Sequence, residues 1–319
     1  MHEARTTAYH IYPSRMSSQS LAYKIREVVP YINWIYFFHA WGMEPRYATI
    51  AEVHACPSCR AGWIASFAEA DRAKAREAAT LYTDAMSLLR QWSEEPVCRA
   101  KFLIANAHSE GDDIIIDGIR FPFLRQQKAD KEGYTLCLSD FIRGAITTEP
   151  SPEERALADI ANKIGVFAAS VTLPSTLDEQ YSLLLASTLG DRLAEATTEK
   201  MHEEVRKHYW GYAKDEQLSI RQLHEEEFQG IRPAVGYPSL PDQSINFLID
   251  KIIDFSDIGI TLSSSGAMSP SSSVSGFMIA HPKAHYFAIG NIGEDQLRDY
   301  AARRGLGVEE SRCFLNRNL

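Results

Sequence analysis

The sequence predicts an α+β fold, in which helices pack against a sheet without alternating regularly with its strands. Two helical blocks surround stretches rich in β-branched and aromatic residues, and no regular strand–helix–strand alternation is visible. The chain has 319 residues, and 45% of them are hydrophobic, which is enough to fill a substantial core. These observations favour α+β over a doubly wound parallel sheet.

Charge and hydropathy exclude several classes of partner. The formal net charge is -9, which disfavours nonspecific binding to nucleic acid. No apolar run approaches the roughly 20 residues of a membrane helix. The first residues also lack the apolar core of a signal peptide. We therefore expect a cytoplasmic protein with neither a nucleic acid nor a membrane as partner.

The cysteines predict a reduced protein. Five cysteines are an odd number in a large domain, which argues against a disulfide framework and for a reducing compartment. Cys56 and Cys59 have zinc or redox spacing, and His54 is nearby. A closed tetrahedral site needs four ligands, however, and no second pair lies at a matching distance. We expect a loop with two reduced thiols rather than a metal or redox site.

The N-terminal part predicts helices followed by strands. Residues 18–44 have a helical pattern that becomes aromatic, which is typical of a buried helix end. Residues 68–92 are rich in Ala, Leu, Arg and Glu and predict a long helix. Residues 101–118 contain apolar runs separated by a polar break that includes a glycine, which predicts strands joined by a turn.

Two further apolar runs precede the longest helical pattern. Residues 134–142 and 164–173 are β-branched and aromatic runs bounded by turns, so both predict core strands. From about residue 175 to 210, apolar residues recur every four or eight positions and form one stripe on a helix. Four polar side chains lie well away from this stripe, namely Asp191, Glu195, His202 and Arg206. From position alone, we interpret Glu195 as part of a solvated helix face.

The segment at residues 226–242 is predicted to be a rigid loop, which we call the proline loop. Its three prolines, Pro233, Pro238 and Pro241, lack an amide donor and fix φ, which excludes a helix or a central strand. Rigid loops that hold a charged side chain often bind a ligand. This loop contains Arg232 between an isoleucine and a proline.

The chain after the proline loop predicts two helices and a hairpin. A helix is expected near residues 245–255. Residues 275–280 and 285–290 are short strand-like runs whose connection has the length of a hairpin loop. A last helix is expected at residues 294–304, and Gly305 suits its C-cap.

Common catalytic and nucleotide-binding motifs are missing from the sequence. There is no P-loop and no G-x-G-x-x-G after a strand, so these modes of phosphate binding are not supported. The motifs H-E-x-x-H, G-x-S-x-G and D-x-H-x-x-G are also missing. We therefore assign no catalytic residue and no metal ligand.

Arg232 is the best binding candidate that the residues themselves indicate. A planar guanidinium held by a rigid loop can bind a carboxylate or a phosphate through two hydrogen bonds. The alternative is a structural arginine that pins the loop to a helix terminus. Glu195 and Glu226 could contact a cationic ligand, whereas Tyr237 and Tyr286 by default are half-buried aromatics with a solvated hydroxyl.

Several segments, in the same order, resemble the activation domain of cobalamin-dependent methionine synthase. The likeness covers nearly the whole chain from about residue 18, so we expect a domain at residues 18–319 after an N-terminal extension at residues 1–17. The segments that carry it are residues 31–43, 111–114, 124–127, 137–141, 190–203, 205–219, 226–242 and 273–301.

The resemblance implies a single α+β domain with a curved antiparallel sheet flanked by helices. It implies a methyltransferase function: the domain supplies S-adenosylmethionine as cosubstrate for the reductive methylation of inactive cob(II)alamin, and a flavodoxin-like protein can donate the electron. The family's cobalamin module carries a D-x-H-x-x-G motif that this sequence lacks. We therefore expect the chain to act in trans on cobalamin carried by a methionine synthase or another corrinoid protein.

A second interpretation keeps the fold and changes the role. The chain would then be a non-catalytic binding protein or chaperone that docks on a corrinoid protein and has lost methylation. Two departures from the family pattern would mark this loss: Asn33 stands where the family usually has Asp, and Ser269 where it usually has Trp. Ser271 also departs from the pattern, since the family usually has Gly there. The loss of a carboxylate that faces the ligand would weaken that contact by roughly 1 to 2 kcal/mol.

The resemblance also assigns site residues. Arg232 would hold the methionyl carboxylate, and Tyr286 would line the same pocket. The residues expected to bind S-adenosylmethionine are Asn33, Glu195, Glu226, Arg232, Ala234, Gly236, Tyr237, Tyr286 and Phe287. The residues expected to face the cobalamin partner are Asp191, Met268, Ser269 and Pro270. Methyl transfer from a sulfonium to Co(I) requires no general acid or base, so the protein's task is orientation.

Overall fold

The computed structural model describes residues 18–129, 133–144, 160, 162–173, 179–316 and 318–319. The expected N-terminal extension at residues 1–17 lies outside this described part. The main sheet of the protein is antiparallel throughout, with strand order β4-β3-β2-β5-β8, and β1 pairs with β2 as well. The strands of this sheet are β1 (Gln19–Tyr23), β2 (Cys98–Glu110), β3 (Asp113–Ile116), β4 (Ile119–Pro122), β5 (Lys163–Val171) and β8 (Ser273–Met278). A second sheet joins β6 (Thr261–Leu262) to β7 (Met268–Ser269).

The 13-residue strand β2 makes the main sheet curl. Its first nine residues pair with β5, and its last four pair with β3. One strand therefore belongs to two parts of the sheet that face different directions, and the sheet is a curled half-barrel. The predicted α+β class with a curved antiparallel sheet is confirmed.

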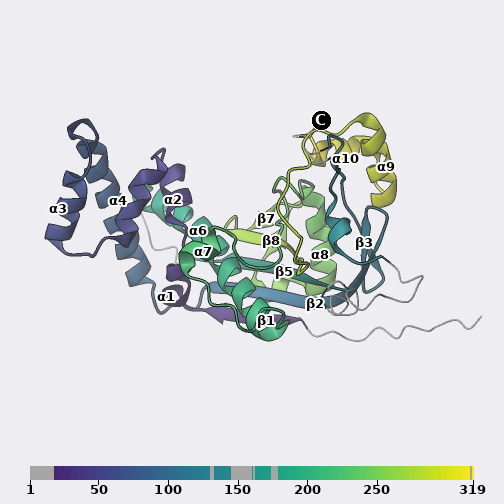
Figure 1. Ribbon diagram of the computed structural model, residues 1–319, viewed down its shortest axis with the longest axis horizontal. Helices are drawn as coiled ribbons and strands as arrows, with labels where there is room; N and C mark the ends of the chain where they lie inside the picture. The colour runs from purple at the N-terminus through teal and green to yellow at the C-terminus, as the bar shows by residue number, and fades with distance from the viewer. Residues whose placement is uncertain (1–17, 130–132, 145–159, 161, 174–178, 317) are drawn as a thin grey trace, which may run out of the picture.

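Helices cover both faces and both ends of the sheet. The described α-helices are α1 (Ile25–Val28), α2 (Trp34–Ala40), α3 (Pro57–Ala65), α4 (Arg72–Gln91), α6 (Gln180–Glu204), α7 (Ile220–His224), α8 (Asn246–Ile253), α9 (Glu294–Arg304) and α10 (Val308–Phe314). Figure 1 shows α2, α3 and α4 at one end of the molecule and α9 and α10 at the other, beside the C-terminus. Among the described residues, no helix is both long and apolar enough to cross a bilayer.

Alternation along the strands divides the core into two layers. Phe102 and Phe167 pack with α1, α2, α4 and α6, whereas Leu103 and Val166 on the opposite face pack with α8. This is the period of two that an antiparallel strand with both faces covered requires. A third, smaller cluster joins α9 and α10 to the chain around Ile289. The sheet is therefore a buried central layer on which the functional loops are mounted.

Several predicted elements are confirmed. Helix α4 matches the helix expected at residues 68–92, and β5 matches the strand expected at residues 164–173. Helix α8 lies within the expected residues 245–255. Helix α9 has the predicted bounds, and Gly305 is its C-cap with φ of 68°.

The expectation of a helix at residues 18–44 was only partly right. Residues 19–23 form β1, whose edge pairing with β2 places Gln19 opposite Phe102. Helical structure begins at Ile25 and is divided into short pieces. Pro30 lies in the short 3-10 helix between them, where its missing N–H prevents one continuous helix.

Two predicted strands are wrong. In residues 134–142 the structure has a 3-10 helix at Leu138–Phe141, and the Asp140 carboxylate accepts bonds from the Cys137 N–H at 2.9 Å and from Arg125 at 2.8 and 2.6 Å. Residues 285–290 form no strand and no hairpin. Instead the Ile289 N–H donates to the Pro238 carbonyl at 2.9 Å, so this segment lies against the proline loop. In both places an apolar run is buried by irregular backbone.

The prediction of a loop with two reduced thiols at Cys56 and Cys59 is also wrong. Cys56 is the N-cap of α3, and it forms a disulfide with Cys59 in the first turn of that helix. The spacing of three residues places both sulfur atoms at the same helix end. Among the described residues, the other three cysteines are free.

Candidate functional site

The proline loop is fixed to the edge of the main sheet. Backbone bonds join Ile231 to Ile279 in both directions at 2.9 Å, and Phe277 donates to the Pro233 carbonyl at 3.0 Å. The Val235 N–H donates to the Ser275 carbonyl at 2.9 Å. The loop thus follows β8 as an irregular edge strand, a position that tolerates proline. Its predicted rigidity has a structural cause in these bonds.

Two glycines allow the loop to approach β8 this closely. A Cβ on Gly276 would lie 2.2 Å from the Pro233 carbonyl oxygen and 2.9 Å from the Ala234 Cα. A Cβ on Gly230 would lie 2.3 Å from the Ile279 carbonyl oxygen, and Gly230 has φ of +87°. Any larger residue at these positions would push the loop away from the sheet.

The far end of the loop is held by α9. The Tyr300 hydroxyl donates to the buried Asp242 carboxylate at 2.6 Å, and Arg304 forms an ion pair with it at 3.5 Å. The same carboxylate accepts the Ser244 N–H at 2.7 Å. The loop is therefore anchored at both ends, and its middle forms one wall of a cavity.

This cavity has a volume of 720 Å³, within the range of small-molecule sites. Its walls are the proline loop, α6, the start of α2 and the segment after residue 285. Eight of the nine residues expected to bind S-adenosylmethionine line it, namely Asn33, Glu195, Glu226, Arg232, Ala234, Tyr237, Tyr286 and Phe287. Residues that are far apart in the sequence therefore converge on one site.

Helix α6 presents a polar stripe to this cavity. Arg192, Glu195 and Glu199 line the cavity, and they are spaced by three and four residues, which places them on one face of a helix. His202 and Arg206 continue the stripe and are completely buried. The interpretation of Glu195 as part of a solvated face is therefore wrong. The face away from the apolar stripe is covered by the proline loop and by residues 212–228 instead of by solvent.

Arg232 reaches across the cavity to this stripe. Its guanidinium donates to the Glu199 carboxylate at 3.1 Å and to Nδ1 of His202 at 3.1 Å, and its side chain is only 12% exposed. Burial lowers the pKa of Arg232, but the facing Glu199 carboxylate outweighs burial and raises it overall. Arg232 is thus charged, and it both pins the loop to α6 and faces the cavity.

His202 is neutral in this arrangement. Burial, then Arg206 and Arg232, hold its pKa well below the ordinary value. An arginine can only donate, so Nδ1 accepts and the ring proton is on Nε2. Nε2 lies 3.4 Å from the Tyr212 hydroxyl. The neutral ring therefore orients the guanidinium without adding a charge to the site.

The neighbouring tyrosines fix the geometry of the loop. The Tyr286 hydroxyl accepts the Arg232 backbone N–H at 2.9 Å. The Tyr237 hydroxyl donates to Glu195, and burial together with that carboxylate raises the pKa of Tyr237. These bonds connect both ends of the cavity wall to residues that line it. The expectation that both hydroxyls are merely solvated is replaced by specific partners.

Glu226 has a conformation that carries strain. Its φ is +59°, which is uncommon for a residue other than glycine, and such residues gather at functional sites. Burial raises the pKa of Glu226, nearby Arg232 lowers it, and Glu199 raises it further. Among the described residues, Glu226 forms no direct ion pair. A cationic ligand could form one.

Asn33 begins α2 and also lines the cavity. Its side-chain oxygen accepts the Ile35 N–H at 3.1 Å, so it is the N-cap of that helix. Its amide nitrogen has no equivalent role in capping. Asn33 therefore presents a donor to the cavity at the position where an aspartate would present an acceptor.

The charges of the cavity walls sum to a net negative value. Two arginines, Arg192 and Arg232, face three carboxylates, Glu195, Glu199 and Glu226, which leaves one negative charge. Oε1 of Glu199 is buried and makes no hydrogen bond within the described residues. A buried acceptor without a partner is costly, so this atom is suited to a ligand that donates. The site favours a ligand with both an anionic and a cationic group.

The remaining predicted residues lie outside this cavity. Gly236 lies on the far side of the loop. Its φ is +89°, and its N–H donates to the Leu240 carbonyl at 2.8 Å, which closes a turn. Asp191 on α6 accepts the Ser272 hydroxyl at 2.9 Å. Met268 and Ser269 form β7, and Pro270 follows it. Asp191 thus contacts Ser272, which follows Pro270 by two residues.

Sequence reasoning missed several cavity residues. Glu199 and Arg192 lie four and three residues from Glu195, so helical spacing alone could have placed them on the same face. Tyr31, His224 and Phe228 also line the cavity. These three come from short helices and loops, whose positions no local pattern reveals.

Two comparisons with known proteins bear on this site. The family described as "Vitamin B12 dependent methionine synthase, activation domain" matches residues 24–305. A solved structure described as "Crystal Structure of the MetH Reactivation Domain bound to AdoHcy" is similar at a TM-score of 0.78 and 32% sequence identity. That match covers 96% of this chain and 91% of the other.

Proposed function

Because the chain belongs to the family of vitamin B12 dependent methionine synthase activation domains, we propose that its cavity binds S-adenosylmethionine for the reductive methylation of cobalamin. The observation that carries the proposal is the charged Arg232, fixed by Glu199 and His202 at the wall of a 720 Å³ cavity with three carboxylates. The similar reactivation domain binds AdoHcy, the demethylated form of this ligand.

The ligand's charges complement those of the cavity. S-adenosylmethionine has one carboxylate, one ammonium and one sulfonium, so its net charge is positive, and the cavity walls are net negative. Arg232 uses two of its five N–H groups on Glu199 and His202, and the others remain for the ligand carboxylate. In this proposal Oε1 of Glu199, which has no hydrogen-bond partner among the described residues, would accept the ammonium, and Glu226 would face the sulfonium.

Aromatic residues and backbone would hold the nucleoside. Tyr286 and Phe287 line the cavity from the segment after β8, and Ala234 and Tyr237 line it from the proline loop. Aromatic rings supply apolar area for a base, while a tyrosine hydroxyl keeps a polar contact. With both ends of the ligand held, its methyl group points in a fixed direction, and orientation of this kind is the protein's contribution to methyl transfer.

The methyl acceptor would be cobalamin carried by a module outside residues 1–319. We propose that the docking surface of that module includes Asp191 and residues 268–270; the Asp191–Ser272 bond connects α6 to the chain just after this segment. A flavodoxin-like protein would donate the electron for reduction of cob(II)alamin. The chain would thus act in trans on a methionine synthase or another corrinoid protein.

Calorimetric titration with S-adenosylmethionine tests the binding proposal. Arg232→Ala should weaken binding by about 10- to 150-fold, because a hydrogen bond to a charged group contributes roughly 1.5 to 3 kcal/mol. Arg221→Ala is the matched control, since Arg221 is exposed on α7 and pairs only with Glu225 at i,i+4 among the described residues. No binding by the unaltered protein, or equal loss in both variants, would refute the proposal.

A second assay separates methylation from mere docking. The chain, a separate cobalamin-carrying methionine synthase, a reductant and S-adenosylmethionine with a labelled methyl group are mixed. We expect transfer of label to cobalamin that depends on Arg232. Docking of the two proteins with no transfer of label would instead support the non-catalytic chaperone.

A further inference from the structure

The first turn of α3 carries a cluster that the methylation site does not use. His54, Cys56 and Cys59 each offer one metal-ligand atom, and these atoms all lie within 4.8 Å of one another. None of the three residues lines the 720 Å³ cavity. We propose that, when the two cysteines are reduced, His54, Cys56 and Cys59 bind a thiophilic divalent metal ion such as Zn²⁺.

The ligand set suits such an ion. Two thiolates and one imidazole are the donors that zinc prefers, and zinc sites with three protein ligands keep a fourth position for water or another group. Once the sulfur–sulfur bond is opened, small rotations of the three side chains would bring their donors to the zinc–sulfur and zinc–nitrogen bond lengths of about 2.3 and 2.0 to 2.1 Å. The sequence, in which His54 is near both cysteines, lacks a second cysteine pair for a closed four-ligand site; the structure shows the donor atoms of His54, Cys56 and Cys59 together.

The local backbone favours thiolates at this position. Cys56 is the N-cap of α3, where the helix dipole stabilises negative charge. Its sulfur accepts the Cys59 N–H at 3.0 Å and lies 3.2 Å from the Ser58 hydroxyl. Pro57 at the first helical position sets the backbone angle at which α3 begins. These contacts would remain when a metal replaces the sulfur–sulfur bond.

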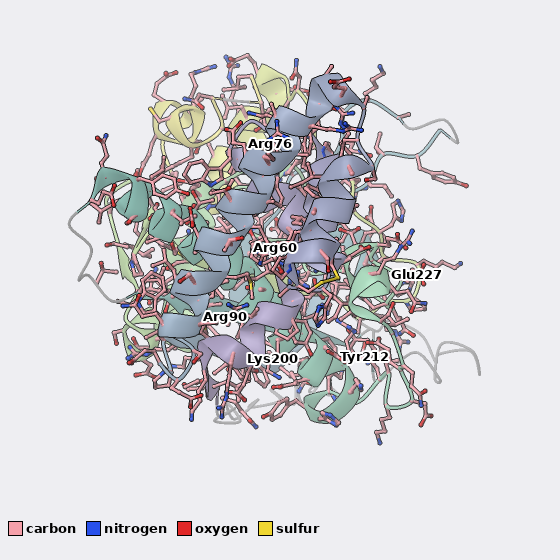
Figure 2. All side chains as sticks on the ribbon, turned by 90° about the vertical axis from the view of Figure 1, so that its left-hand side faces the viewer. Arg60, Arg76, Arg90, Lys200, Tyr212 and Glu227 are labelled. Atoms are coloured by element: carbon pink, nitrogen blue, oxygen red, sulfur yellow. A yellow bond between two sulfur atoms is a disulfide. The ribbon has the colours of Figure 1, made fainter. Side chains whose placement is uncertain are left out.

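The support of the cluster is rigid. The Arg60 guanidinium donates to Thr83 of α4 at 2.8 Å, and the Trp63 indole donates to Thr49 at 3.0 Å. Figure 2 shows the sulfur–sulfur bond in yellow at one end of a helix, on the side of the molecule that faces the viewer and carries Arg60. The helix start that holds Cys56 and Cys59 is thus fixed to α4 and to the segment before His54, and it is open to solvent.

The two buried cysteines do not compete for the metal. Burial raises the pKa of Cys98 to about 12 and that of Cys137 to about 11, so neither is a thiolate near neutral pH. Cys313 is exposed and free, which makes it the natural control. Among the described residues, Cys56 and Cys59 are therefore the pair of cysteines available to a metal that binds through two thiolates.

The disulfide is the metal-free, oxidised state of the cluster. A phosphine reductant opens it: the phosphine and one water are converted to the phosphine oxide, and the two sulfurs gain two electrons and two protons to become thiols. Metal binding then displaces the two thiol protons, so affinity should rise with pH. The oxidised protein should bind no metal at this position.

Titration of the phosphine-reduced full chain with Co²⁺, followed by displacement with Zn²⁺, tests this proposal. We expect one equivalent of Co²⁺ with thiolate-to-metal charge-transfer absorption, which Cys313→Ser leaves unchanged. Cys56→Ser and Cys59→Ser should each remove most of that absorption. Loss of an outer-shell partner typically costs 10- to 100-fold in metal affinity, so His54→Ala should weaken Zn²⁺ binding by at least about that factor.

Three results would overturn the proposal. They are absence of thiolate absorption in the reduced protein, its loss in Cys313→Ser, and unchanged Zn²⁺ affinity in His54→Ala. Circular dichroism of each variant checks that the fold is retained, which we expect because the cluster is at the surface. A Zn²⁺-dependent rise in the melting temperature of the reduced protein, missing in Cys56→Ser, gives a readout that does not depend on absorption.

Discussion

Asn33→Asp is the substitution that tests the ligand-facing wall of the cavity most directly. Asn33 caps α2 through its side-chain oxygen, which accepts the Ile35 N–H at 3.1 Å. Aspartate and asparagine are about equally good N-caps, so the change should leave stability nearly unaltered. The amide nitrogen, a donor, becomes a carboxylate oxygen, an acceptor. The cavity wall then has a second net negative charge.

The expected magnitude depends on the hydrogen bond that the new carboxylate would accept from the ligand. Bonds to charged groups contribute roughly 1.5 to 3 kcal/mol and neutral ones about 1 kcal/mol, so the difference is about 0.5 to 2 kcal/mol. That difference corresponds to S-adenosylmethionine binding about 2- to 30-fold tighter. Asn33 is half-buried, so the lower value applies at high salt, where screening weakens the new interaction.

Calorimetric titration at two salt concentrations measures this effect. Asn33→Ala is the control, because it removes the cap without adding a charge and should cost about 1 kcal/mol in the free energy of unfolding. S-adenosylhomocysteine, which lacks the sulfonium, gives a second comparison. If Asn33→Asp leaves the affinity unchanged or lowers it while the melting temperature is constant, then residue 33 does not contact a cationic group of the ligand.

Three further predictions concern the cavity and its support. Glu226→Gln should weaken the binding of S-adenosylmethionine about fivefold, or ~1 kcal/mol, and the binding of S-adenosylhomocysteine less. Equal losses of affinity for the two ligands in calorimetry would contradict a carboxylate near the sulfonium. Gly276→Ala should lower the free energy of unfolding by about 1 to 3 kcal/mol and weaken ligand binding, because the new Cβ would meet the Pro233 carbonyl. An unchanged midpoint of urea unfolding would contradict this prediction. Because the pKa of His202 is lowered in the folded protein, only the unfolded chain binds a proton on this imidazole near pH 6. The free energy of unfolding should therefore fall as the pH drops below about 6.5, by up to ~1.4 kcal/mol per pH unit. Urea unfolding between pH 7 and 5 should show this slope and lose it in His202→Gln, which keeps an acceptor for Arg232; the same slope in both proteins would refute the assignment.

Local sequence determined the elements that have a clear period. Helix α4 and strand β5 lie where composition and apolar runs predict them, within four residues at each end, and the glycine after α9 is its left-handed C-cap. The failures are aromatic runs in which the period is unclear. Residues 285–290 resemble a strand, yet their backbone bonds to Pro238, a partner that only the folded chain brings near. An apolar run therefore predicted burial correctly and its secondary structure wrongly.

The candidate site shows the same division. The resemblance identified eight cavity residues because they belong to motifs, and Arg232 was also indicated by its rigid loop. Helix α6 was misinterpreted because its polar stripe looks like a solvated face. His202 and Arg206 are buried only because residues from the loops after α6 cover them. A helical wheel separates polar from apolar faces, but it does not say what covers each one.

The anchoring of Asp242 by Tyr300 and Arg304 links two distant parts of the molecule. A ligand that tightens the proline loop would also tighten its attachment to α9. By thermodynamic reciprocity, whatever loosens the C-terminal helices would loosen the grip on the ligand by the same free energy. On the proposed function, the C-terminal helices would thus be a second place from which occupancy of the cavity could be tuned, although none of their described side chains lines the cavity.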